Sequence, residues 1–537
     1  MDPDKQHLDK VEQEDSERKG NGQGPIDYNF EGLELLDVVP TLPKRWWHYK
    51  HLRDLNFLLL AGIMWSTASG FDGSLFNGMQ ALPQWKDYFG NPTGNALSMS
   101  SVPQLVANLL SNALSYLFVD RFGRRWSIIF GSLLLIFSSI LRAFSQNYVW
   151  WCCSQIPQGV GVGLISTSAP PYISETAYPT HRAKAVSLYA GTYAVGGLIA
   201  AGMNWGLLTV NSTWAWRAAV LAQVVPSGIQ CIIAFYAPES PRWLIYKNRT
   251  DEAFEILVKY HAGGDRTSKL VHFEMAEIKA NLEQEKLTKA GQWMEYLRTP
   301  GTRHRLAITI IIPLSLQWVG NALISYYLPI VLQTVGITDP GQVLGINLGN
   351  SAVSLIGSFL AVSFIDGMGR RKLFLLGYSL MLCALIIWTI CSAIDAQRDF
   401  KDKGLAGAVV LMIYLFGSFY HLSSSIAANY IMEISIYSLR SRAAGAYQVV
   451  GGLANLFNTW VNPIAMTAIG WKYYIVWTVL TAFWLVFVYL YVPETKGKSL
   501  EEVAVIFDGE DALVGTNAMT KLDVEEGKFD KESSPSS

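Results

Sequence analysis

Charged residues are scarce over most of this 537-residue chain, although its two ends and its middle are rich in them. Only 28 of its 85 Lys, Arg, Asp and Glu residues lie in the two long blocks 54–238 and 306–493. Soluble globular chains carry roughly 25% charged residues. The scarcity excludes an ordinary soluble enzyme, a disordered chain and a nucleic-acid-binding protein, and the net charge of −1 gives no long-range attraction toward an acidic partner.

Other chemical signatures are also missing. The five cysteines are an odd number and lie inside apolar runs, which favours small packing residues over a disulfide framework. The first 24 residues hold no apolar core of a cleavable secretory signal, so the first apolar run must itself direct membrane insertion. The sequence has no G-x-S-x-G, P-loop, dinucleotide or metal-ligand motif, and we expect no catalytic residues, no cofactor and no metal.

Long apolar runs fill the two charge-poor blocks. A run of about 20 apolar residues crosses the hydrocarbon core as a helix, because lipid offers no partners to free backbone groups. Each block holds six runs, which predicts an all-α membrane protein with twelve transmembrane helices in two pseudo-symmetric six-helix bundles. The predicted spans are 55–79, 97–119, 126–144, 147–168, 184–208, 216–236, 306–331, 342–365, 372–393, 405–430, 443–467 and 472–491.

The charge pattern divides the chain into five segments. The two bundles, 54–238 and 306–493, are flanked by a largely disordered N-terminal tail (1–53) and a C-terminal tail (494–537), and are joined by a loop with short helices (239–305). Lys and Arg gather in the loops on the side of 239–305, so the positive-inside rule places that loop and both termini in the cytosol. Asn211, in an Asn-Ser-Thr triplet, then lies on the opposite side as a candidate glycosylation site.

Three charged motifs occur once in each bundle, in the same order. The run Asp120–Arg125 recurs 246 residues later as Asp366–Arg371, and Glu175 with Arg182 recurs 258 residues later as Glu433 with Arg440. Pro238-Glu239-Ser240 recurs 255 residues later as Pro493-Glu494-Thr495. Nearly constant offsets indicate a duplicated six-helix unit.

The repeated motifs sit at the predicted cytosolic helix ends, where acid and Arg side chains can pair between neighbouring helices. Such pairs would lock the two bundles together on the cytosolic side and break when that side opens; alternatively, the basic residues only satisfy the positive-inside rule. Glycines within the motifs permit tight turns. The candidate gate comprises Arg121, Arg124, Arg125, Glu175, Arg182, Glu239, Arg242, Asp366, Arg370, Arg371, Glu433, Arg440 and Glu494.

One acid, Asp72, lies deep inside a span, and it is the only charged residue between Asp54 and Lys86. A carboxylate inside the membrane is costly, so a function is the default hypothesis. Desolvation favours its protonated form, which suits a proton carrier. The alternative is a packing role in which neutral hydrogen bonds hold the side chain.

The motifs together resemble the sugar porter family of the major facilitator superfamily. They read DRFGRR (120–125), DGMGRR (366–371), PESPRW (238–243) and PETKGKSLEE (493–502), and the resemblance covers roughly residues 50–505. The fungal lactose, cellodextrin and hexose permease branch is most similar in the phrases FDGSLFNGMQ (71–80), QWVGNALISYYLP (317–329) and NPIAMTAIGWKYYIV (462–476). The resemblance implies twelve helices around a central cavity and sugar transport by proton symport or facilitated diffusion.

The resemblance also assigns roles to cavity residues. The acid of the matching first-helix motif couples protons in similar symporters, which implies this role for Asp72, but the fourth-helix Arg that pairs with it is replaced here by Gln155. Asp72 should then be harder to ionise, and Gln155 can hydrogen-bond either protonation state, so symport and uncoupled diffusion both remain open.

Polar residues of the seventh span are candidate sugar contacts. Amides, an indole and phenols suit a neutral polyhydroxyl ligand. Gln317 and Asn321 match the family pattern and lie four residues apart, hence on one helical face; the alternative is that these amides hold neighbouring helices together. The candidate substrate-binding residues are Gln317, Trp318, Asn321 and Tyr326 of the seventh span, Asn350 of the eighth and Asn455 of the eleventh.

Other positions depart from the family. Ala190 replaces an amide, Ala428 and Gly452 replace aromatic residues, and Ser425 and Ile431 lie near positions of helix-breaking prolines; His421 is a candidate cavity residue. These changes leave open a rival transporter of a non-sugar metabolite, and a non-transporting sugar sensor is a further alternative. The favoured hypothesis is a monomeric plasma-membrane transporter whose partners are a small-molecule sugar, a proton and the lipid bilayer.

Overall fold

The structure is a computed structural model that describes residues 35–40, 43–287, 293–398, 402–436, 439–498 and 500–509. Most of the two predicted tails, including the segment expected to be disordered, lies outside these residues. The described residues form helices and no strand.

Twelve membrane-crossing segments follow one another along the chain. In the N-terminal half they are α3 (Lys50–Met79), α6 (Val102–Phe122), α7 (Arg124–Ala143), α8 (Tyr148–Thr176), α9 (Pro179–Leu207) and the pair α10 (Trp214–Ala222) and α11 (Val224–Tyr236). In the C-terminal half they are the pair α15 (Pro300–Gln317) and α16 (Asn321–Gln333), then α17 (Pro340–Met368), α18 (Arg370–Gln397), α19 (Lys403–Ile434), α20 (Arg440–Ile469) and α21 (Tyr473–Tyr491).

Nine helical stretches of the described chain are long and apolar enough to cross a membrane, and one of these runs through both α20 and α21. These stretches account for ten of the crossing segments, and α3 and α8, which are also long enough to span a membrane, are the other two.

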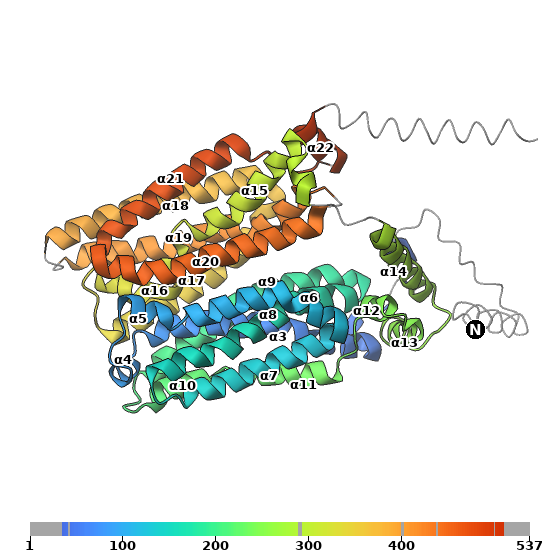
Figure 1. The fold of residues 1–537 in the computed structure, drawn as a ribbon, viewed down its shortest axis with the longest axis horizontal. Coiled ribbons are helices and arrows are strands. Elements are labelled where there is room, and N and C mark those ends of the chain that lie inside the picture. The colour runs from blue at the N-terminus through green and yellow to red at the C-terminus, as the bar shows by residue number, and fades with distance from the viewer. Residues whose placement is uncertain are drawn as a thin grey trace, which may run out of the picture.

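Short helices mark the two ends of the molecule. At one end, the α4–α5 end, lie α4 (Pro83–Tyr88) and α5 (Gly94–Met99); at the other, the loop-helix end, lie α12 (Pro241–Tyr246), α13 (Thr250–His261), α14 (Lys269–Leu287) and α22 (Leu500–Asp508). The predicted helical loop is thus confirmed as α12 to α14. Figure 1 shows the two halves converging at the α4–α5 end and diverging toward the loop-helix end.

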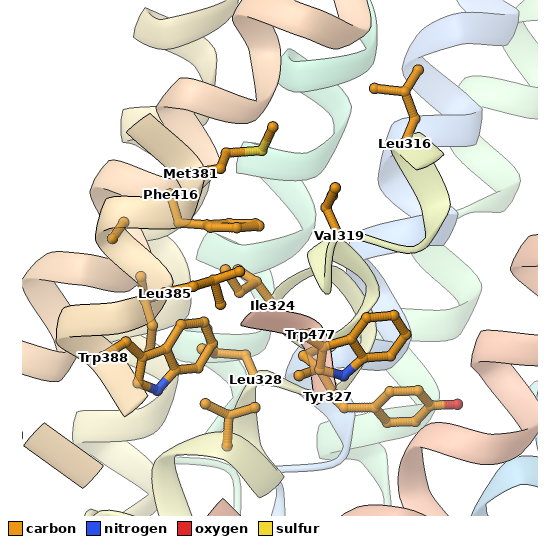
Figure 2. Packing of buried hydrophobic residues seen from close by; sticks show 14 of the residues in the cluster. Leu316, Val319, Ile324, Tyr327, Leu328, Met381, Leu385, Trp388, Phe416 and Trp477 are labelled. Carbon is orange, nitrogen blue, oxygen red and sulfur yellow. The ribbon is translucent and has the colours of Figure 1, made fainter. Parts of the chain in front are cut away.

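The seventh segment is broken where hydropathy alone predicts one continuous span. Gly320 has a left-handed backbone (φ 93°), which glycine adopts without strain, and a Cβ there would lie 3.2 Å from the Trp477 ring. The broken segment is anchored in the core of the C-terminal half, where Val319 and Leu328 pack among Trp477 and Leu385 (Figure 2). This packing fixes the positions of the polar residues on either side of the break.

Candidate functional site

A cavity of about 330 Å³ lies between the two halves. Its wall comes from α3 and α9 of the N-terminal half and from α15, α16, α17 and α19 of the C-terminal half. The lining residues are Gly73, Ser74, Asn77, Tyr193, Ala194, Gly197, Gln317, Asn321, Ile324, Ser325, Tyr326, Asn347, Asn350, Ser351, Ser354, Gly417, Tyr420 and His421. Amides, hydroxyls and three tyrosine rings therefore surround the cavity, and both halves contribute side chains to its wall.

Four of the six predicted substrate contacts line this cavity: Gln317, Asn321, Tyr326 and Asn350. Gln317 and Asn321 do so for a reason other than the predicted one. The helix breaks between them, so they do not share a continuous helical face; the last residue of α15 and the first of α16 meet at the same wall. Asn455 is not among the lining residues, although it lies close to the Tyr326 side chain.

Trp318 is turned away from the cavity. Its ring packs against Phe457 of α20, with the ring centroids 5.3 Å apart, and its carbonyl accepts a hydrogen bond of 3.0 Å from Trp484 Nε1. The interpretation of Trp318 as a sugar contact is corrected by this geometry. Residue 318 belongs to the non-helical break, so its direction does not follow from the helical register of Gln317.

A polar stripe on α17 was not predicted from the sequence. Asn347, Ser351 and Ser354 join Asn350 on the cavity wall, at spacings of three and four residues that put them on one helical face. This periodicity of small polar residues in an apolar helix was the available signal. Tyr193 and Tyr420 were also not predicted. They give the cavity aromatic surface, although Ala428 and Gly452 replace the aromatic residues of the family.

Two departures from the family have structural counterparts. His421 does line the cavity, and its Nδ1 lies 3.3 Å from Ser358 Oγ. Gly452 instead packs against α6, where a Cβ would lie 2.5 Å from Leu109 Cδ2, so a larger side chain there would require the Leu109 side chain to move. The Ala190 side chain lies outside the described residues.

At the α4–α5 end the two halves are joined by two side-chain amides, one from the last turn of α3 and one from the residue that follows this helix. Asn77 Nδ2 donates to the Ile324 carbonyl (3.0 Å), and Asn77 Oδ1 accepts from the Leu328 backbone N–H (3.1 Å). These two backbone groups would bond each other in an unbroken helix, but α16 is kinked at Tyr327. Gln80 Nε2 adds a bond of 2.7 Å to the Tyr326 carbonyl.

Asp72 lies beside the cavity wall and is hydrogen-bonded on both carboxylate oxygens. Gln104 of α6 donates to Oδ2 (2.6 Å), and Arg142 Nη2 of α7 lies 3.5 Å from Oδ1. The expectation that Asp72 lacks a cationic partner is therefore wrong. The cation comes from the end of α7, while Gln155 of α8 hydrogen-bonds Arg142 rather than Asp72.

The repeated charged motifs form the same arrangement in both halves. In the N-terminal half, Arg124 pairs with Glu175 (3.2 Å), Ser240 Oγ donates to Glu175 (2.5 Å), and Glu239 accepts the backbone N–H groups of Arg124 and Arg125 (3.0 and 3.1 Å).

In the C-terminal half, Arg370 pairs with Glu433 (2.9 Å), Thr495 Oγ1 donates to Glu433 (2.6 Å), and Glu494 accepts the backbone N–H groups of Arg370 and Arg371 (2.8 and 3.1 Å). Gly123 (φ 96°) and Gly369 (φ 90°) make the left-handed turns before these helices, as the sequence predicted.

Both of these ion pairs connect helices of the same half. In this structure they hold the ends of each bundle together and do not bridge the halves. The gate hypothesis requires such bridges only when the cytosolic side is closed. Of the remaining gate candidates, Arg121 is exposed beside the Phe122 ring, and Arg182, Arg242 and Arg440 are half-buried. The Asp366 side chain lies outside the described residues.

The two matched glutamates differ in electrostatics. Burial raises the pKa of Glu239 above its ordinary value, although three backbone N–H groups and Arg124 oppose this effect. Burial acts in the same direction on Glu494, but backbone N–H groups, first that of Lys496, outweigh it and lower the pKa of Glu494. At neutral pH, Glu494 therefore has the greater preference for its ionised form.

Comparisons with known proteins agree with this geometry. The model of the family described as "Sugar (and other) transporter" matches residues 58–507. An arabinose-proton symporter of Bacillus subtilis is 30% identical over 447 residues, which cover 81% of this chain and 91% of that protein. A high-affinity glucose transporter of Kluyveromyces lactis is 25% identical over 488 residues, 88% of each chain.

A solved structure shares the fold. The inward-open xylose transporter XylE of E. coli matches with a TM-score of 0.71 at 22% identity, covering 84% of this chain and all of that one. This likeness confirms the predicted all-helical major facilitator fold. The matched proteins are transporters and not enzymes.

Proposed function

Because the chain belongs to the sugar (and other) transporter family, as its motifs predicted, we propose that it carries a neutral mono- or disaccharide across a membrane together with protons. The observation that carries this proposal is the cavity between the halves. Its described lining includes no Lys, Arg, Asp or Glu, while amides and hydroxyls match sugar hydroxyls and tyrosine rings can stack on sugar CH faces. An organic acid would find no permanent counter-charge there.

Asp72 is the proton carrier in this proposal. It immediately precedes Gly73 of the cavity wall, its side chain is 11% exposed, and it is the acid placed deep in a membrane-crossing helix. An acid inside a membrane-crossing helix is costly and typically marks a proton pathway. The name of the B. subtilis relative, an arabinose-proton symporter, supports the same coupling.

The transport cycle proposed here alternates access between the two ends of the molecule. The α4–α5 end, held by Asn77 and Gln80, faces the cell exterior, and the loop-helix end faces the cytosol together with both termini. When the cytosolic side closes, the charged residues of the repeated motifs bridge the halves. A monomer in the plasma membrane is the proposed working form.

Transport assays in transporter-deficient cells test this function. Labelled hexoses, pentoses and disaccharides are supplied with and without a protonophore, and we expect at least one sugar to accumulate in a protonophore-sensitive way. Uptake without accumulation would contradict the proton coupling but not the sugar transport. Failure of every sugar, with the protein shown at the cell surface, would favour a non-sugar metabolite, and sugar binding without counterflow in liposomes would favour a sensor.

Asn211 is the proposed glycosylation site. It is exposed in the turn between α9 and α10, at the end assigned to the cell exterior. Treatment with an N-glycosidase should lower the apparent mass of the wild-type protein expressed in a eukaryotic host and leave Asn211→Gln unchanged. An identical mass shift in the variant would place the glycan elsewhere.

A further inference from the structure

Arg142 is a cation buried inside the N-terminal half, with only 3% of its side chain exposed. It occupies the last turn of α7, and its guanidinium reaches three acceptors: Asp72 on α3, Gln155 on α8, and Gln223 at the junction of α10 and α11. The Trp151 ring lies 5.7 Å from its Cζ. A buried guanidinium must be compensated in this way, because an unpaired charge in a membrane protein interior is costly.

The three acceptors hold the guanidinium unequally. The contact to Asp72 Oδ1 is 3.5 Å, at the outer limit of a hydrogen bond, whereas Gln155 Oε1 accepts at 3.2 Å and Gln223 Oε1 lies closer still. Gln155 is itself fixed, since its Nε2 donates to the Ser100 carbonyl at 2.9 Å. Two neutral amides therefore keep Arg142 in place whether or not Asp72 carries a charge.

Asp72 is held independently of Arg142. Gln104 Nε2 donates to its second oxygen at 2.6 Å, and its remaining titratable neighbours are Tyr193 on α9 and Tyr326 on α16, both at the cavity wall. Arg142 is thus the cation that faces Asp72 among the described residues. Protonation of the carboxylate removes one long ion-pair contact and leaves the other bonds of both side chains intact.

We propose that Arg142 is the positioning cation for the proton at Asp72, and that Gln155 and Gln223 retain its guanidinium when Asp72 is protonated. The inference rests on the proposed proton symport. A proton from one side of the membrane binds the Asp72 carboxylate and replaces the Arg142 contact; its release to the other side restores that contact. No other bond is made or broken, and the guanidinium remains charged throughout.

This assignment explains why Gln155 is compatible with a coupled transporter. Arg142 and Gln155 lie side by side on the antiparallel helices α7 and α8 and are hydrogen-bonded to each other. A cation on either helix of this pair reaches the same carboxylate, provided that the other helix supplies the amide. The charge balance of the site is kept although the fourth-helix cation is missing.

The test uses the full-length protein in liposomes with an imposed proton gradient and a sugar shown to be transported. We expect Arg142→Gln to abolish accumulation and to move the pH of half-maximal uptake upward by about one unit, a tenfold change in proton affinity. The double variant R142Q/Q155R exchanges the two side chains and should restore both accumulation and the pH profile. Arg217→Gln is the matched control, because Arg217 also stacks on aromatic rings in this half but donates to Tyr88.

The outcomes separate the inference from the function on which it rests. If the wild type itself shows no gradient-driven accumulation, the proposed symport fails and the role of Arg142 fails with it. If the wild type accumulates sugar and R142Q does so with an unchanged pH profile, only the role of Arg142 is overturned. A merely structural Arg142 would lower the amount of folded protein without moving the pH profile, and this result also overturns the inference.

Discussion

Glu239 and Glu494 occupy equivalent places in the two halves but use their carboxylate oxygens differently. The backbone N–H groups of Arg124, Arg125 and Ser240 all donate to Oε1 of Glu239. In Glu494, Oε1 accepts from Arg370, Thr495 and Lys496, while Oε2 accepts from Arg371. Glutamine can therefore replace Glu239 and keep these three bonds, but at position 494 its amide nitrogen would face a donor.

The first prediction follows from this difference. Glu494→Gln should destabilise the protein by about 1 kcal/mol through one lost charged hydrogen bond, or about 1 °C in melting temperature for a chain of this length, and Glu239→Gln should cost less. Thermal unfolding in detergent measures both. Because the pKa of Glu494 is lowered, its contribution is present at neutral pH and lost as the pH falls through that pKa, so the gap between wild type and E494Q should narrow in acid. Equal losses in the two variants would contradict the prediction.

Asn77 should control opening at the α4–α5 end. Asn77→Ala removes its bonds to Ile324, Leu328 and Asn347, each worth about 0.5–1.5 kcal/mol, and should shift the equilibrium toward opening at that end. The measurement is labelling of a Ser351→Cys cavity cysteine by a membrane-impermeant thiol reagent added outside. Gln84→Ala is the matched control, since Gln84 bonds the Leu208 and Val210 carbonyls within one half. Similar labelling rates in both variants would refute a clasp at Asn77.

Asp72→Asn should separate coupling from transport. Asparagine retains the size of the side chain and a hydrogen-bond acceptor but cannot bind and release a proton, so uphill accumulation should be lost while sugar counterflow continues. Asp54→Asn, on the same helix near its beginning, is the control and should accumulate sugar normally. Undiminished accumulation in the Asp72 variant would remove this residue from the mechanism.

Gln317 and Trp318 are neighbours with different expected effects on sugar affinity. Gln317→Ala removes an amide from the cavity wall and should raise KM roughly 2- to 10-fold, the equivalent of one hydrogen bond. Trp318→Phe preserves an aromatic ring against Phe457 outside the cavity and should leave KM nearly unchanged. Concentration-dependent initial uptake rates distinguish the two, and a larger KM effect at Trp318 would reverse their assigned positions.

Hydropathy predicted the twelve crossing segments because lipid burial imposes a length of about 20 apolar residues on each of them. It did not predict the break at Gly320, since apolar residues continue on both sides of it. The direction of Trp318 was lost with this break. The contact between Gln223 and Arg142 joins segments far apart in the sequence, so no periodicity of a single helix indicates it.

Arg142 was overlooked because a basic residue at the end of a span usually extends to the membrane surface. Its inward direction depends on acceptors from three other segments of the chain, and no local pattern reports their convergence. The acids and arginines of the repeated motifs were easier to recognise, since their partners are repeated at nearly one offset. In this structure these residues pair within each half and not across the halves.

Because α16 is kinked at Tyr327, opening at the α4–α5 end can replace hydrogen bonds to Asn77 with a backbone hydrogen bond inside α16. While that end is closed, the Asn77 amide satisfies the Ile324 carbonyl and the Leu328 N–H. If α16 straightens as it moves away, these two groups can bond each other, and the released amide faces the incoming water. The number of satisfied backbone groups is then the same before and after the movement, so neither end state is trapped by a dehydrated peptide group.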